Sequence, residues 1–184
     1  MPRRRPPAIP VAFVKGEGRR YRSLVHRADG VVVAFEGGAF NAVGGPAGEV
    51  PHDVAHLVVE DELALRSGVY GLLAAGAMFG QATVVAGRRP PHAARRGREL
   101  IARAGDRVTQ AEMLTRAVCD LSAAGGAADP GAIRRAVGPR WWSDGVTRDA
   151  LARACERLRD AGARWAALPP HGALDAVWRH PPPA

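Results

Sequence analysis

Lysine and cysteine are nearly absent from this chain. Lys15 is the only lysine among 26 basic residues, and Cys119 and Cys155 are the only cysteines. Two cysteines are too few for a disulfide framework or for a zinc site built from cysteine thiolates. Both lie in segments that we predict to be helical and apolar, so we expect them to be buried as small hydrophobic side chains.

No hydrophobic run reaches the length of a membrane span, which is about 20 residues. The longest run, residues 70–86, is interrupted by three glycines. The basic N-terminus is not typical of a secretion signal, because Lys15 and Glu17 cut its apolar stretch short. We therefore expect a cytoplasmic protein that does not insert into a membrane.

Arginine supplies almost all of the positive charge. The formal net charge is +8 and the isoelectric point is about 11.0. Heavy use of alanine, arginine and glycine is typical of a GC-rich coding sequence, so codon bias alone can account for part of this basicity. Arginine clusters at residues 3–5, 19–22, 88–89 and 95–98, and the pair Trp141 and Trp142 after Arg140, nevertheless make nucleic acid a possible partner.

The chain is long enough to bury a hydrophobic core, since 47% of its 184 residues are hydrophobic. We divide it into a flexible basic arm at 1–10, a β-meander with a pair of helices at 11–86, a basic linker at 87–98 and a helical region at 99–184. The expected fold class is α+β. An N-terminal antiparallel β-meander packs on a histidine-bearing helix, and the C-terminal half is mostly helical.

Short β-branched and apolar runs at 11–14, 21–26 and 31–35 predict the meander, with a hairpin turn at Asp29 and Gly30. Five glycines and a proline within 37–50 predict a loop. Helices are expected from Pro51 to about Arg66, from 69 to about 81, at 99–122 with a kink at Gly105, from Pro130 to Val137, and from Thr147 to Gly162; a short final strand is expected at 174–178.

The segment His52-Asp53-Val54-Ala55-His56 carries the strongest chemical signal. Histidines four residues apart on a helix lie about 40° apart and can bind one metal ion. Val59 and Leu63 fall on the same face, so both imidazoles should point inward, where they need polar partners. The alternative is that the two histidines only pack and cap the helix, hydrogen-bonded to nearby acids or backbone.

A metal site needs a third ligand from elsewhere in the chain. Glu60 cannot join both histidines, because it lies about 12 Å from His52 along the helix axis. Glu60 could pair with His56, or it could support the site without contacting the metal. Five residues are left as third-ligand candidates: Glu62, Glu99, Glu112, Glu36 and His26.

The pattern resembles the H-E-x-x-H helix of zincin-type metallohydrolases, with Asp53 in place of the glutamate. The resemblance implies that His52 and His56 bind zinc and that Asp53 is the general base. Aspartate is one methylene shorter, which alters the reach of that base. The pattern also resembles the zinc motif of a helical family of ubiquinone biosynthesis, but Gly68 stands where that family has a glutamate.

These observations favour a metal-dependent protein, a hydrolase that uses zinc or another divalent metal. His52 and His56 are its metal ligands, and Asp53 or Glu60 is the catalytic base, acting on a small-molecule or peptide substrate. Two other hypotheses remain open: a non-catalytic nucleic-acid-binding or regulatory protein that uses its arginines, and an interaction module with no site.

Overall fold

The computed structural model describes residues 8–38, 50–80 and 82–183. Five antiparallel strands form one sheet in the order β4-β3-β2-β1-β5. The strands are β1 (Ile9–Lys15), β2 (Tyr21–His26), β3 (Val32–Gly37), β4 (Thr83–Ala86) and β5 (Ala173–Trp178). The last strand pairs with the first, so the C-terminal end of the chain completes the N-terminal sheet.

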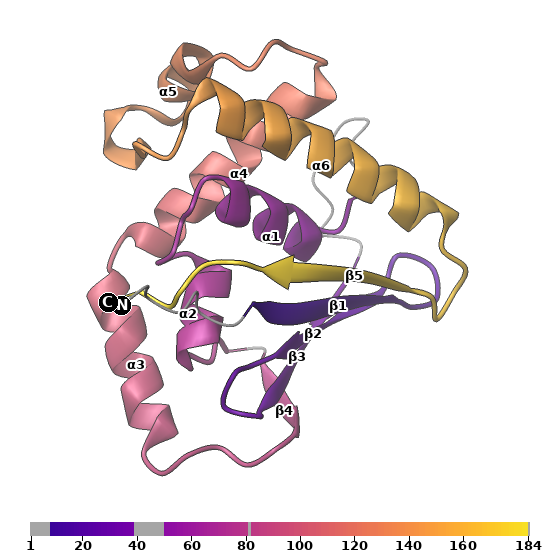
Figure 1. Cartoon of the computed structure of the whole chain (residues 1–184), viewed down its shortest axis with the longest axis vertical. Helices are drawn as coiled ribbons and strands as arrows, with labels where there is room; N and C mark the ends of the chain where they lie inside the picture. The colour runs from indigo at the N-terminus through magenta and orange to yellow at the C-terminus, as the bar shows by residue number, and fades with distance from the viewer. Residues whose placement is uncertain (1–7, 39–49, 81, 184) are drawn as a thin grey trace, which may run out of the picture.

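Alternation along the strands gives the sheet one buried face. In β1, Ile9, Val11 and Phe13 are buried, while the residues between them are more exposed. Successive side chains of a strand point to opposite faces, so these three lie on the same face of the sheet. Figure 1 shows the long helices stacked on one side of the sheet, where this apolar face is covered.

The helices are α1 (His52–Glu62), α2 (Val69–Ala75), α3 (Ala93–Ala104), α4 (Arg107–Ala123), α5 (Pro130–Val137) and α6 (Arg148–Ala167), with a 3-10 turn at Pro139–Trp141. Asp129 and Thr147 cap α5 and α6 through their side chains. None of the helices within the described ranges is both long and apolar enough to cross a membrane.

Helix α1 is the centre of the molecule. It packs against α2, α4 and α6, and every residue from Val54 to Asp61 is buried. In Figure 1 it lies between the sheet and the two long helices α4 and α6. Because this helix is enclosed on all sides, each of its polar side chains must find a partner inside the protein.

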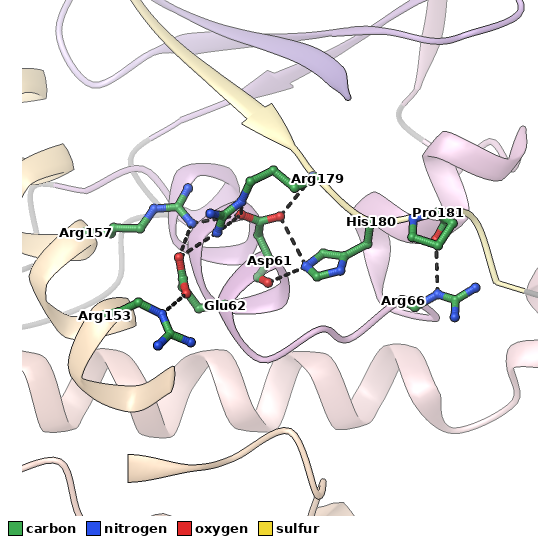
Figure 2. Close-up of polar contacts among 8 residues, drawn as sticks. All are labelled: Asp61, Glu62, Arg66, Arg153, Arg157, Arg179, His180 and Pro181. Carbon is green, nitrogen blue, oxygen red and sulfur yellow. Dashed lines mark hydrogen bonds and ion pairs between the residues drawn. The ribbon is translucent and has the colours of Figure 1, made fainter. Parts of the chain in front are cut away.

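An arginine cluster fixes the C-terminal end of α1 (Figure 2). Asp61 and Glu62 have almost fully buried carboxylates. Arg157 from α6 contacts both, at 2.8 Å and 2.6 Å, and Arg179 after β5 also contacts both, at 2.5 Å and 2.6 Å. Arg153 binds Glu62 at 2.9 Å. The opposite charges offset the cost of burying the two carboxylates.

The expected α+β fold with its meander, histidine helix and mostly helical C-terminal half is confirmed, and so are the hairpin at Gly30 and the final strand. Several boundaries were wrong. Ile9 and Pro10 belong to β1 and not to the basic arm, whose residues 1–7 lie outside the described ranges. Most of the glycine-rich loop, residues 39–49, lies outside them too.

The region after α1 differs most from the prediction. The second helix ends at Ala75, because Gly76 adopts a left-handed conformation with φ of 107°. Strand β4 follows after the predicted end of that helix, where no strand was predicted, and α3 begins at Ala93 inside the predicted linker. Gly105 separates α3 from α4 completely, with φ of 53°. Helix α6 continues through Gly162 to Ala167, because tertiary contacts outweigh the low helix propensity of one glycine.

Candidate metal centre

The two histidines of α1 share one site, as their spacing predicts. The helix begins at His52, and the rings of His52 and His56 lie 4.4 Å apart between centroids. Val59 and Leu63 on the same face are fully buried, so the stripe points inward. Tyr21 and Tyr70 hold the first turn from the sheet and from α2: the hydroxyl of Tyr21 accepts from the Asp53 amide, and that of Tyr70 donates to the Asp53 carbonyl.

Glu112 of α4 reaches the same point from the opposite side. One carboxylate oxygen of Glu112 lies 3.0 Å from Nε2 of His52, and the other lies 2.8 Å from Nε2 of His56. The three side chains form a group whose possible ligand atoms all lie within 4.8 Å of one another. Both Nε2 atoms therefore converge on one carboxylate, each on a different oxygen, and the three side chains form a candidate metal-binding group.

Carboxylates also stand behind both rings, at the Nδ1 atoms. Nδ1 of His56 lies 3.0 Å from Oε1 of Glu60, and Nδ1 of His52 lies 3.6 Å from Oδ1 of Asp53. The hydroxyl of Ser23 donates to the other Asp53 oxygen at 2.6 Å. A carboxylate at Nδ1 favours the tautomer with its proton there, which leaves the Nε2 lone pair free for a metal.

Glu60 is fully buried, and its carboxylate also accepts hydrogen bonds from the backbone at the start of α2. Its Oε1 accepts from the Val69 amide at 3.0 Å, and its Oε2 accepts from the Tyr70 amide at 2.9 Å. A β-carbon at Gly68 would lie 2.6 Å from this carboxylate, so the close approach needs glycine. The first amides of a helix have no hydrogen-bond acceptor within the helix, and the Glu60 carboxylate accepts hydrogen bonds from two of them.

The catalytic role predicted for Asp53 and Glu60 stays a prediction, and these contacts favour a different one. Both carboxylates lie on the Nδ1 side of the rings, whereas Glu112 lies on the Nε2 side. A carboxylate in that position orients the imidazole and increases its basicity. The geometry therefore supports positioning roles for Asp53 and Glu60.

The electrostatics of the group follow from these contacts. Burial lowers the pKa of His56, but the carboxylates of Glu112 and Glu60 outweigh burial and raise the pKa to about 9. Asp53 and then Glu112 raise the pKa of His52. The two histidines in turn hold the pKa of Glu112 well below its usual range. Without a metal, a proton on His56 is therefore stabilised between two carboxylates.

The contact between His56 and Glu112 is nevertheless not a well-formed hydrogen bond. Nε2 of His56 is buried and has no hydrogen-bond partner of acceptable geometry within the described residues, although the Glu112 oxygen is only 2.8 Å away. A buried polar atom without a hydrogen bond is uncommon and calls for an explanation. One explanation is a cation bound by both Nε2 of His56 and the Glu112 oxygen.

The group is open on one side. The side chain of His56 is 3% exposed, whereas those of His52 and Glu112 are 33% and 54% exposed. A small cavity of about 50 Å³ adjoins the two rings, and apolar side chains form most of its wall. Its lining residues are Phe35, His52, Asp53, His56, Val69, Tyr70 and Leu73.

The other third-ligand candidates are engaged elsewhere. Glu62 lies within the arginine cluster at the far end of α1 (Figure 2). Glu36 pairs with Arg22 across β2 and β3, and Glu99 is 3.7 Å from Arg95 on α3. His26, at the end of β2, is exposed and does not belong to the group formed by His52, His56 and Glu112.

No known protein family, curated protein or solved structure matches this chain. A fold does not by itself define a function, and here no relative suggests one. The function is therefore inferred from the chemistry of the side chains.

Proposed function

We propose that this protein binds a divalent metal ion, with zinc the best fit, through His52, His56 and Glu112. The observation that carries the proposal is the convergence of both Nε2 atoms on one carboxylate, with further carboxylates behind both rings. Two imidazoles and one carboxylate form a ligand set used by catalytic zinc sites, which keep a fourth position for water or substrate.

The spacing of the three side chains suits such an ion. Zinc ligands at about 2.0–2.1 Å in a tetrahedron lie about 3.3 Å from one another. The contacts of the two Nε2 atoms, each to a different Glu112 oxygen, are 3.0 Å and 2.8 Å, and all candidate ligand atoms lie within 4.8 Å of one another, so the side chains would have to adjust to surround one ion. Since Glu112 is half exposed, its side chain has room for this adjustment.

We further propose that the site hydrolyses a small ester or amide, which includes a peptide bond. A zinc ion at such a site lowers the pKa of bound water to about 7 and polarises a carbonyl group. Asp53 and Glu60 hold the two imidazole rings in the orientation that points both Nε2 atoms at the ion. The exposed side between His52 and Glu112 admits the substrate. The adjoining cavity of about 50 Å³ has room only for a small apolar group beside the reacting carbonyl.

Metal analysis of protein purified without a metal-affinity tag tests the binding proposal. We expect about one equivalent of zinc in the wild type, and a large loss of affinity in His56→Ala and Glu112→Ala, because each removes one of three protein ligands. Glu156→Ala is the matched control for Glu112→Ala, since Glu156 is an exposed glutamate of α6. A wild type that binds no divalent metal at neutral pH would refute the proposal.

Hydrolysis needs its own measurement. The zinc-loaded protein, the same protein stripped with a chelator and the Glu112→Ala variant are compared on a panel of p-nitrophenyl esters and short peptides. Turnover that requires both zinc and Glu112 supports the hydrolase. Stoichiometric zinc binding with no turnover on any member of the panel would leave a metal-binding protein and reject the hydrolase assignment for these substrates.

A further inference from the structure

The segment from Arg88 to Arg103 carries a large share of the protein's net charge. It contains six arginines and one glutamate, a net of +5, while the whole chain has a formal net charge of +8. Most of this segment is helix α3. Its arginines are Arg88, Arg89, Arg95, Arg96, Arg98 and Arg103; we call the surface that they form the α3 surface.

Nine of the sixteen arginines that the structure describes outside the α3 surface have an acidic partner. Arg153, Arg157 and Arg179 bind Asp61 or Glu62, and further arginines on the other helices and strands also have acidic partners. On the α3 surface only Arg95 has one among the described residues, and at 3.7 Å. Four others are exposed and have no ion pair there: Arg88, Arg96, Arg98 and Arg103. Folding therefore leaves the basic charge of α3 free.

The packing of α3 directs this charge outward. Ala93 and Gly97 are its buried residues, and a β-carbon at Gly97 would lie 3.3 Å from Ala77, so the two segments approach closely. Leu100 and Ala104 fall within about 60° of those two residues on a helical wheel. Arg95 and Arg98 fall on the opposite arc, and Arg96 and Arg103 lie about 70–90° from the buried stripe, over a helix of 12 residues that is about 18 Å long.

Phosphate groups are the partner that this surface fits. Arginine binds phosphate with two parallel hydrogen bonds and is less strongly hydrated than lysine. A lipid surface is a poor match, because membrane-bound helices insert an apolar face and α3 uses its own against Gly76 and Ala77. Residues 87–105 contain no phenylalanine, tyrosine or tryptophan and only His92 as a ring to stack on an unpaired base, which favours a duplex over a single strand.

We propose that the α3 surface binds the phosphate backbone of duplex DNA without sequence preference. Residues 87–105 contain no serine, threonine, asparagine or glutamine. Asparagine and glutamine pair with adenine edges and serine and threonine with either base, so this helix lacks those base contacts and offers mainly arginine, which also binds phosphate. Exposed Ala102 lies between Arg95 and Arg98 on the wheel, where a backbone can approach closely, and exposed Glu99 lies between Arg95 and Arg103.

Fluorescence anisotropy with a labelled 20-base-pair duplex tests this proposal on the full chain between 50 and 200 mM salt. We expect binding at low salt, with log K falling linearly with log salt by about 0.9 for each phosphate contacted. The triple variant Arg96→Ala, Arg98→Ala and Arg103→Ala should lower this slope by about two to three and weaken binding more than tenfold at 50 mM salt. Circular dichroism checks that the variant remains folded.

The matched control is the triple variant Arg19→Ala, Arg148→Ala and Arg159→Ala. These arginines are exposed and without an acidic partner in the described residues, and the variant changes the net charge by the same amount. It should keep most of the affinity. Equal losses in the two variants, no binding of wild type at 50 mM salt, or binding only to single strands, duplex RNA or phosphatidylserine vesicles would overturn the proposal.

Discussion

The stability of the metal-free protein should fall as the pH rises through the pKa of His56. The folded pKa of about 9 lies above the ordinary value of 6.5. A raised pKa means that the folded state holds the proton more tightly than the unfolded chain. The stabilisation is therefore fully present below about pH 6.5 and is lost as the pH rises through about 9. A shift of this size corresponds to about 3 kcal/mol, at 1.36 kcal/mol per unit.

Zinc should reverse this dependence. A metal at Nε2 requires the neutral imidazole, so zinc must displace the proton that Glu60 and Glu112 stabilise. If one proton is released, the apparent zinc affinity should increase about tenfold per pH unit between pH 6 and 9. The stability that zinc adds should therefore grow with pH over the range in which the metal-free protein loses stability.

Urea unfolding at pH 6 to 10, with a chelator or with zinc, measures both effects. His56→Gln removes the titrating group, so the difference between wild type and variant isolates it from the cysteines and tyrosines that also titrate. His26→Gln is the matched control, since His26 is exposed on β2 and should follow the wild type. Parallel pH curves for wild type and His56→Gln without metal would refute the raised pKa.

Three further predictions concern the supports of the site. Asp53→Asn should keep zinc stoichiometry but weaken zinc affinity about 10- to 100-fold by isothermal titration calorimetry, because it removes the carboxylate behind His52 and leaves the three proposed ligands in place; equal affinity would remove that role. Arg179→Ala should cost about 2 kcal/mol in urea unfolding, because Asp61 keeps Arg157 but loses part of its compensation; no loss would contradict a stabilising cluster. Gly145→Ala should cost about 1–3 kcal/mol, because its β-carbon would lie 2.1 Å from the Leu63 carbonyl oxygen; an unchanged unfolding midpoint would contradict this contact.

The sequence predicts the parts of the site that depend on local periodicity. A four-residue spacing fixes where His52 and His56 lie on a helix, and Val59 and Leu63 indicate which side of it is buried. The same reasoning excludes Glu60 as a ligand shared by both histidines and allows it to pair with His56, which is where the structure has it. Each of these inferences uses residues of a single helix.

The third member of the candidate metal-binding group could not be identified from any single segment of the sequence. Glu112 lies 60 residues after His52 in the sequence and meets it only because α1 and α4 pack together. Its sequence neighbourhood does not distinguish it from Glu62 or Glu99. Strand β4 was missed for a related reason: its four residues are all exposed, so no alternation of buried and exposed positions marks them.

The two ends of α1 share one physical requirement. A helix buried on all sides cannot leave a polar side chain without a partner, and α1 carries His56, Glu60 and Asp61 in its buried stretch. Asp61 meets this requirement with arginines from α6 and the C-terminal segment. Glu60 meets it with the amides of α2.

His56 is the exception among these three buried residues. Its Nδ1 is paired with Glu60, while its buried Nε2 faces a carboxylate without a proper hydrogen bond. In the metal-free protein a proton on Nε2 faces the Glu112 carboxylate, and the proposed metal would take the place of that proton. The neighbours of that atom are the side chains of His52 and Glu112, and our proposal is that all three side chains bind one divalent metal ion.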